Sequence, residues 1–456
     1  MLSEPCRLYL IFAALFLPLV ATGGSARDSR LTSLSESARS RSPELRALHE
    51  RWEEAKARTL EAWSNFLPRI DLNLTQSRSQ DFSILQSGAL GADAGTLFQP
   101  QALSLSRWEI LGTLPLFQRS YQLEVIQRKS EAELARVRYE KASSELEIQV
   151  HEAYGAWLAD QADLLALATA LRASTVDLKE TELRFQLGSA TLLDSLKART
   201  HQGSLEARRP RLEQAVAQSR EALEVLCGAI PEVSTPEVAD RLAEISDPSP
   251  WTASLPPGDF DALLPALLSH DLEWNTIEKE NVTAECLLRV PLGAELPTFQ
   301  LQARVNRLGP DWPTALVTQD LSYSLAAVVS IPITSGGRLI QRLRQKRHGS
   351  SALQAENESR TSRWRREARA SWQELQVLQA ELTSLRLQTE QQAELERLTR
   401  KSHSLGKAPL TDLLNAQDVH LQAQTQVTRT ALKLTTLARR WQLRLGVDRK
   451  VQESKP

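Results

Sequence analysis

The side chains with the clearest capacity for chemistry are two aspartates, Asp194 and Asp412, which occupy the same place in two copies of one sequence. Each follows a glycine, Gly188 or Gly406, by six residues. A carboxylate at the start of a helix can accept hydrogen bonds from the first turn, or it can attract cations from solution. Both uses stay open for Asp412, whereas helix capping is favoured for Asp194.

The segments around these aspartates indicate that a whole structural unit occurs twice. Residues 187–198 read LGSATLLDSLKA and residues 405–416 read LGKAPLTDLLNA, with seven of the twelve positions identical. The offset between the two segments is 218 residues, and Gly228 and Gly446 each lie 40 residues after the glycine of their own copy. A repeat of this length predicts internal two-fold similarity of the fold.

No pattern of catalytic or metal-binding residues accompanies the aspartates. His151-Glu152 has no second histidine at metalloprotease spacing, and phosphate-loop, nucleophile-elbow and paired CxxC motifs are absent from the sequence. Cys227 and Cys286 are expected to be free thiols in helices. The net charge is −1 with both signs mixed throughout, which gives no sign of nucleic-acid binding. We expect no enzymatic activity, no cofactor and no bound metal.

The N-terminus has the pattern of a secretory signal peptide. An apolar run from Leu8 to Val20 precedes small residues, and Gly24 and Ala26 suit cleavage after Ala26. The alternative is a retained anchor helix, although the run is short for a membrane span. The domain prediction is a signal peptide at 1–26, a first repeat at 27–228, a linker rich in Pro, Ser and acidic residues at 229–265, a second repeat at 266–446 and a tail at 447–456.

Each repeat is predicted to begin with a helix and two amphipathic strands. The helices run from Ser42-Pro43 to about Phe66 and from His270-Asp271 to about Val290. Apolar and polar residues then alternate with a period of two, so each strand has one apolar and one polar face. A shift of this alternation between Leu105 and Trp108 predicts a bulge. The strands are expected at 67–74, 103–114, 296–305 and 321–331, with the second and fourth ending at a proline.

A very long helix follows each strand pair. Residues 118–185 and 338–403 contain no proline and one glycine each, and about 68 helical residues extend roughly 100 Å. Gly188 and Gly406 end these helices, and shorter helices return to Gly228 and Gly446. Steps of three and four residues predict a coiled-coil seam at Leu164, Leu167, Leu171, Ser174, Leu178, Thr181 and Phe185, and again at Leu375, Leu378, Leu382 and Leu385.

Strands of about ten residues with one apolar face match the requirements of a membrane β-strand. Four strands cannot close a barrel, and an open sheet edge in lipid is excluded because its backbone groups would be unpaired. Several copies of the chain would therefore have to share one barrel. The apolar faces would contact lipid, and the faces with Ser, Gln, Asn and Arg would line water.

This order of elements, given twice, resembles the TolC family of outer membrane efflux proteins. The segments that carry the resemblance are 42–74, 185–228, 331–337 and 404–446. It implies a mainly helical fold with membrane strands, in which a homotrimer shares a twelve-stranded β-barrel and extends a long α-barrel into the periplasm. It also implies a periplasmic adaptor (membrane fusion protein) and an inner-membrane pump as partners in efflux or type I secretion.

The resemblance further implies roles for the two turns between long helices. Adaptor docking maps onto the tips Leu187-Gly188-Ser189 and Leu405-Gly406-Lys407. A ring of acidic residues that narrows the pore maps onto Asp412, and Asn415 stands where a second ring aspartate would be. The rival interpretation is a periplasmic adaptor or a structural coiled-coil protein that makes no pore. Adaptors normally carry a single long hairpin, so two hairpins preceded by strand pairs favour the channel.

Overall fold

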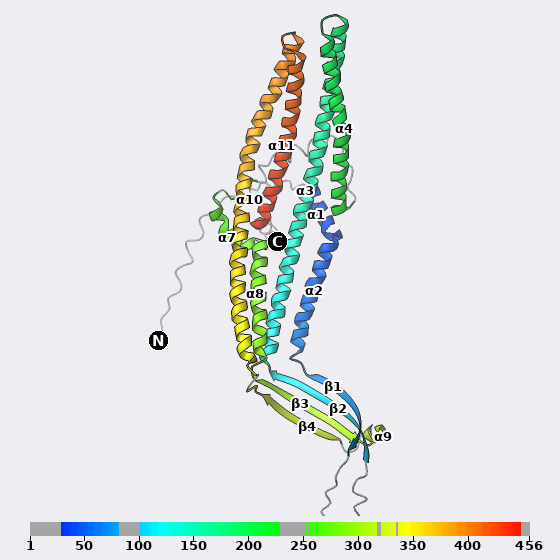
Figure 1. Cartoon of the computed structure of the whole chain (residues 1–456), viewed down its shortest axis with the longest axis vertical. Helices are drawn as coiled ribbons and strands as arrows, with labels where there is room; N and C mark the ends of the chain where they lie inside the picture. Colours follow the sequence, from blue (N-terminus) through cyan, green and yellow to red (C-terminus); the bar gives the residue numbers. More distant parts are fainter. Residues whose placement is uncertain are drawn as a thin grey trace, which may run out of the picture. The chain divides into compact units, whose positions relative to one another are not determined.

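In the computed structural model, the order of elements repeats along the chain. The described residues are 29–81, 101–228, 252–253, 255–256, 258–316, 321–333 and 336–447. The predicted signal peptide, nearly all of the predicted linker up to residue 259 and the tail from residue 448 lie outside them. A helix, two strands and a long helical hairpin occur twice, first as α2, β1, β2, α3 and α4 and then as α8, β3, β4, α10 and α11 (Figure 1).

The chain divides into two compact units, and the first unit is entirely helical in its described part. It comprises residues 1–42, 146–256 and 375–442. The two predicted very long helices are confirmed as α3 and α10, which span 68 and 67 residues. The helices that contribute to this unit are α1 (Ser29–Arg41), α3 (Arg119–Gln186), α4 (Leu192–Cys227), α10 (Arg338–Ser404) and α11 (Leu410–Arg444).

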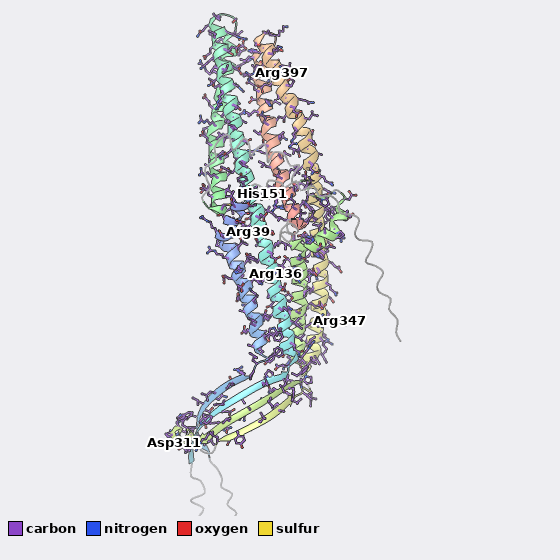
Figure 2. All side chains as sticks on the ribbon, turned by 180° about the vertical axis from the view of Figure 1, so that it is seen from behind. Arg39, Arg136, His151, Asp311, Arg347 and Arg397 are labelled. Atoms are coloured by element: carbon purple, nitrogen blue, oxygen red, sulfur yellow. The ribbon has the colours of Figure 1, made fainter. Side chains whose placement is uncertain are left out.

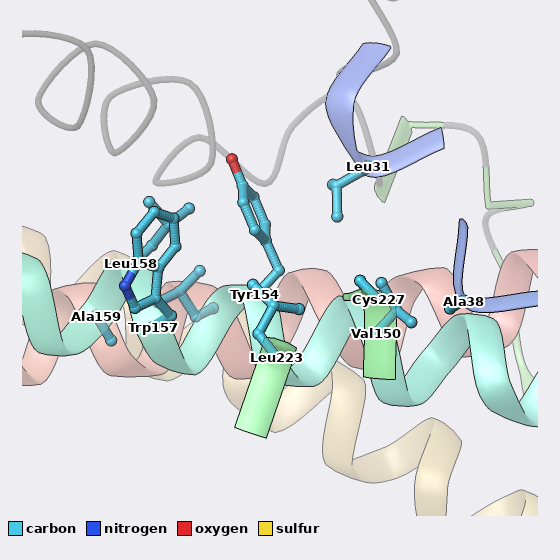
Figure 3. Packing of buried hydrophobic residues seen from close by; sticks show 10 residues of the cluster. Leu31, Ala38, Val150, Tyr154, Trp157, Leu158, Ala159, Leu223 and Cys227 are labelled. Carbon is cyan, nitrogen blue, oxygen red and sulfur yellow. The ribbon is translucent and has the colours of Figure 1, made fainter. Parts of the chain in front are cut away.

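The core of the first unit forms where α1 and α4 pack on α3. Tyr154, Trp157 and Leu158 of α3 are almost completely buried together with Leu223 of α4 (Figure 3). The predicted seam is confirmed at the positions where α3 and α10 bury side chains, which are Leu167, Ser174, Thr181, Leu375, Leu382 and Leu385. Phe185, the last predicted seam residue, is 42% exposed.

Helix α1 was not predicted from the sequence. It packs beside α4, and the Ser37 hydroxyl donates a hydrogen bond to the Cys227 carbonyl at 2.8 Å. Arg39, which is labelled in Figure 2, forms an ion pair with Glu147 of α3 at 2.7 Å. Helix α1 has a low apolar content, so a search for apolar periodicity does not find it. Contacts with neighbouring helices stabilise it more than one continuous apolar stripe does.

The second unit combines a four-stranded antiparallel sheet with helices. It comprises residues 43–145, 257–374 and 443–456, and the strand order is β1-β2-β3-β4. Helices α2 and α8 stand beside the adjoining parts of α3 and α10 (Figure 1). The elements that belong wholly to this unit are α2 (Pro43–Ser64), β1 (Arg69–Asp81), β2 (Gln101–Phe117), α7 (Phe260–His270), α8 (Leu272–Gly293), β3 (Thr298–Gly309), α9 (Trp312–Leu316) and β4 (Ser322–Ser330).

The sheet register confirms the predicted division into an apolar and a polar face. Rows of directly paired residues run across all four strands, and successive rows face opposite sides. The apolar rows are Ile70–Gly112–Ala303–Leu325 and Leu72–Ile110–Val305–Tyr323; the polar rows are Asp71–Leu111–Arg304–Ser324 and Asn73–Glu109–Asn306–Ser322.

Two details of strand β2 were predicted wrongly. No bulge lies between Leu105 and Trp108, because the register with β1 is continuous there and the irregularity falls between Pro115 and Phe117. The strand also continues through Pro115 instead of ending before it. Pairing of β2 with β1 ends at Thr113. Pro115, which has no N–H, therefore loses no hydrogen bond to β1. The change in the alternation of apolar and polar residues between Leu105 and Trp108 occurs where β2 contacts α9. There the Ala315 carbonyl accepts a hydrogen bond from Trp108 Nε1 at 2.7 Å.

Two short helices also escaped sequence analysis. Helix α9 lies in what was expected to be a loop between β3 and β4, and α7 begins at Phe260, within the range expected to be linker. Helix α7 buries Phe260, Leu263 and Leu267, so this part of the range contributes to the core. The predicted helix from Ser42-Pro43 is confirmed as α2, with Pro43 as its first residue.

Candidate functional site

The turn between α3 and α4, here called the first tip, is closed by backbone hydrogen bonds. The Gly188 N–H bonds to the Phe185 carbonyl at 3.0 Å, and the Ser189 N–H bonds to the Arg184 carbonyl at 2.8 Å. This pair of bonds is the Schellman arrangement, which places the terminal residue in the left-handed region. Gly188 accordingly has φ 73°, which only glycine adopts without strain.

The turn between α10 and α11, the second tip, has the same hydrogen-bond pattern. Gly406, with φ 69°, donates to His403 at 2.9 Å, and Lys407 donates to Ser402 at 2.9 Å. An added Cβ at either tip glycine would meet no atom within 4 Å, so both turns are open around the glycine. The predicted tips therefore have one conformation in both repeats, even though Ser189 and Lys407 differ in charge.

The two tips differ in how much apolar surface they leave uncovered. After the first tip, Leu192, Leu193 and Leu196 are each more than half exposed, and Leu187 is 74% exposed. After the second tip, the corresponding helix start buries its leucines. Leu410, Leu413 and Leu414 form a small core with Ala198 of α4. The similar leucine patterns of the two segments gave no signal for this difference.

The aspartates that follow the tips also occupy different environments. The Thr191 hydroxyl donates to Asp194 Oδ2 at 2.6 Å, and the Asp194 N–H donates to Thr191 Oγ1 at 3.1 Å. The Thr191 N–H completes a capping box with Oδ2 at 3.2 Å. The hydroxyl bond lowers the pKa of Asp194 below its ordinary value. The helix-capping use predicted for Asp194 is thus observed.

Asp412 has no such role, because Pro409 stands where the first repeat has Thr191. A proline has neither a hydroxyl nor an N–H, so it can supply neither of the hydrogen bonds that hold Asp194. Within the described residues, the Asp412 carboxylate accepts no hydrogen bond, and both Asp412 and Asn415 are exposed. They share a face of α11 that avoids the small core around Leu413.

Ion pairs between buried aspartates of α3 and more exposed arginines join α3 to the second hairpin within the first unit, and sequence analysis did not find them. Asp163 of α3 is 5% exposed and accepts from Arg429 of α11 at 2.7 Å. Burial raises the pKa of Asp163 despite this bond. Asp177, further along α3, accepts from Arg400 of α10 at 3.1 Å and from Gln417 of α11 at 2.7 Å. Their spacing of 14 residues, four helical turns, places both on one face of α3.

The thiols offer no further chemistry. Cys227 is buried and free, and burial raises its pKa. Cys286 is also free, and its side chain is half-buried. In the ranges that the structure describes, no group of three or more His, Cys, Asp or Glu side chains is placed to hold a metal ion. None of the described helices is both long enough and apolar enough to cross a membrane.

Comparisons with known proteins match the first repeat to a family model. Residues 34–229 match the model of the outer membrane efflux protein family. A search of curated protein sequences gave no significant match.

Solved channels have the same fold over almost the whole chain. CusC aligns with a TM-score of 0.75 at 14% identity, covering 92% of each chain. VceC from Vibrio cholerae aligns with a TM-score of 0.73 at 17% identity, covering 91% of this chain and 96% of that one. The open state of MtrE from Neisseria gonorrhoeae aligns at 0.72 and 17%, covering 91% and 89%. Residues 34–229, which include the first strand pair and the first long hairpin, thus match the outer membrane efflux protein family, and the chain as a whole has the fold of these solved channels.

Proposed function

We propose that three copies of this chain form the exit duct of a tripartite efflux or secretion system. The duct would cross the outer membrane as a β-barrel and extend into the periplasm as an α-barrel. It would receive substrate from a periplasmic adaptor and an inner-membrane pump. The observation that carries this proposal is the four-stranded sheet, which has one exposed apolar face and two unpaired edges.

The apolar face has the exposure of a surface made for lipid. In the isolated chain, Ile70, Leu325 and Tyr323 are 74%, 72% and 87% exposed, and they lie on the same side of the sheet. Exposed apolar surface on this scale marks a binding or membrane face. The opposite side carries polar groups, including an ion pair at 3.2 Å between Arg304 and Glu109. That side suits a water-filled lumen.

The unpaired edges require further copies of the chain. Among the residues that the structure describes, strands β1 and β4 each pair on one side only. Because lipid cannot satisfy the free N–H and C=O groups of an edge, β4 of one copy would pair with β1 of the next. Three four-stranded sheets joined in this way give a twelve-stranded barrel, which lies within the known range of membrane barrels.

The tips are the proposed docking surface for the adaptor. Both glycine turns are open, and the first tip adds an exposed apolar ridge formed by Leu187, Leu192, Leu193 and Leu196. A partner helix with its own apolar stripe could bury this ridge, and the open glycines would let its backbone approach closely. Lys407 at the second tip would supply a charged contact.

The proposed pore constriction is formed by Asp412 together with Asn415. Pro409 leaves the Asp412 carboxylate without a capping partner, so its charge is available to the lumen. Three carboxylates around one axis would attract cations and hold multivalent ones most strongly. Asp194 lies at the equivalent position but is committed to its capping box.

Membrane fractionation tests the exit-duct proposal against a non-pore adaptor or structural protein. We expect the protein in the outer membrane, as trimers that run as one species in detergent until they are heated. Release by osmotic shock as a monomer would instead support the rival. Conductance of the purified protein in planar bilayers gives an independent measurement, since a protein that makes no pore has none.

Site-specific cross-linking tests the docking surface separately. Ser189→Cys and Lys407→Cys are expected to cross-link to a co-expressed adaptor, because both residues lie at the open turns. Gln214→Cys, which is also exposed but lies 22 residues into α4, is the matched control and should give no product. Equal cross-linking at all three positions would contradict docking at the tips.

A further inference from the structure

A cavity of about 170 Å³, partly open to solvent and lined by both polar and apolar side chains, lies in the first unit, and the proposed transport role does not use it. Small side chains of α3, mostly alanines, form one wall. The other walls carry titratable residues: His201 from α4, Glu396 from α10, and Asp418 and His420 from α11. One cavity thus brings together two histidines and two carboxylates.

His201 is the least satisfied of these groups. It is 9% exposed, and its Nε2 is buried without a hydrogen-bond partner among the described residues. Its Nδ1 lies 3.8 Å from Asp418 Oδ2, which is too far for a hydrogen bond. Asp418 Oδ1 is also buried without a hydrogen bond, and Arg208 Nη1 is 3.6 Å away from it.

The other charged groups around the cavity already have close partners. On α3, Asp177 accepts hydrogen bonds from Arg400 and Gln417. On α10, Glu396 pairs with His420 at 2.7 Å. Asp418 of α11 is therefore the carboxylate left to face His201.

Burial outweighs these charges and lowers the pKa of His201. Desolvation is the largest influence, Asp418 and Asp177 oppose it, and Arg208 of its own helix adds to it. In the packed state, His201 is therefore neutral over a wider range of pH than an ordinary histidine.

We propose that His201 is a proton-sensitive latch between the two hairpins: α4 stays packed against α11 while the ring is neutral, and this contact loosens when the surroundings become acidic and the ring is protonated. The neutral ring fits a closed site with one unpartnered nitrogen. An imidazolium has two N–H donors that need partners, and the buried Nε2 has none, so protonation favours an arrangement in which water can reach it.

The direction of the effect follows from proton linkage. In the opened state His201 has its ordinary pKa of about 6.5, whereas in the packed state its pKa is lower. The opened state therefore binds more protons than the packed state. The packed state is favoured above about pH 6.5, and this stabilisation is lost as the pH falls toward and through the lower pKa that His201 has in the packed state. At pH 5.5 one proton can raise the opened population by up to about tenfold.

Hydrogen–deuterium exchange on the full-length trimer tests the latch. We expect protection of the backbone amides at 198–208 of α4 and 413–424 of α11 to fall about three- to tenfold between pH 7.5 and 5.5. Protection is corrected for the pH dependence of exchange itself. His201→Gln should keep the protection seen at pH 7.5 and lose the pH response. The matched control is His420→Gln, which changes a histidine of the same cavity that already has Glu396 as its partner and should keep the response.

Asp418→Asn provides a second variant that leaves the histidine in place. It removes the carboxylate that offsets the charge on His201, so the loss of protection should continue to lower pH than in the unmodified protein. The latch is refuted if the unmodified protein shows no response, if His201→Gln responds like it, or if Asp418→Asn shortens the pH range.

Discussion

Lysine substitution at neighbouring residues of β4 tests which face of the sheet contacts lipid. Leu325 belongs to an apolar row with Ala303, whereas the adjacent Ala326 is paired with Gln302 and faces the other side. Both residues are exposed in the isolated chain. Leu325→Lys would place a charge in lipid, while Ala326→Lys would place it in the aqueous lumen at nearly the same depth.

The position of Leu325 along the strand gives the magnitude. Strand β4 has nine residues, which at about 3.4 Å each and a tilt of about 45° span roughly 21 Å of membrane. Leu325 is the fourth of them, within about 3 Å of the middle. A lysine near the midplane costs about 2–4 kcal/mol per chain. This corresponds to roughly a 30- to 700-fold loss in the equilibrium for insertion.

Ala326→Lys should change stability by less than about 0.5 kcal/mol, because its side chain stays in water. Ser324→Lys is a less clean comparison, since Ser324 lies directly opposite Arg304. Two cations there would cost about 0.2–1 kcal/mol, even on the correct face. The predicted loss of stability is therefore largest for Leu325→Lys, smaller for Ser324→Lys and smallest for Ala326→Lys.

The temperature at which trimers dissociate in detergent, and the amount of trimer in the outer membrane, measure these effects. Leu325→Lys should lower both strongly, and Ala326→Lys should leave both near those of the unmodified protein. Equal losses at Leu325 and Ala326 would show that the two faces of the sheet do not differ in environment, and the assignment of lipid and lumen would fail.

Three further predictions concern the tips. Asp412→Ala should reduce cation selectivity and block by multivalent cations in planar bilayers, without lowering thermal stability. Pro409→Thr should have the same effect, because the new threonine can form a capping box with Asp412. Unchanged selectivity in both variants would exclude the constriction. Thr191→Ala should cost about 1 kcal/mol in thermal unfolding, because it removes the hydroxyl that caps Asp194, with no change in selectivity. Gly188→Ala should cost about 1–2 kcal/mol from the positive φ alone, since its Cβ meets no atom, and a neutral result would show that the turn relaxes.

The features predicted correctly from the sequence depend on local patterns. Proline-free runs predicted α3 and α10 to within a residue at each end, and alternation predicted the apolar rows of the sheet. Glycine predicted the tips, because a Schellman turn needs a residue that tolerates positive φ. In each case the residue type alone determines the local geometry, so no knowledge of distant contacts is required.

The features that were missed depend on contacts between distant residues. Asp163 and Arg429 are 266 residues apart, and nothing near either of them in the sequence marks it as buried. Helix α1 is likewise defined by its contact with the end of α4. The path of β2 through Pro115 follows from where its neighbour β1 stops, and a single strand carries no information about that.

The two tips show how single residues can give the two copies of a duplicated unit different environments. Thr191 ties the aspartate of the first repeat into its helix, and Pro409 releases the aspartate of the second. Leu187 and Leu405 of the turns themselves are both exposed, but the helix that follows the first turn leaves its leucines exposed, while the helix that follows the second buries its leucines against Ala198. Apolar surface for a partner is thus concentrated at the first tip, and unpaired negative charge lies just after the second. Because the backbone is the same at both tips, these differences come from side chains, and exchanging Thr191 and Pro409 should exchange the environments of the two aspartates.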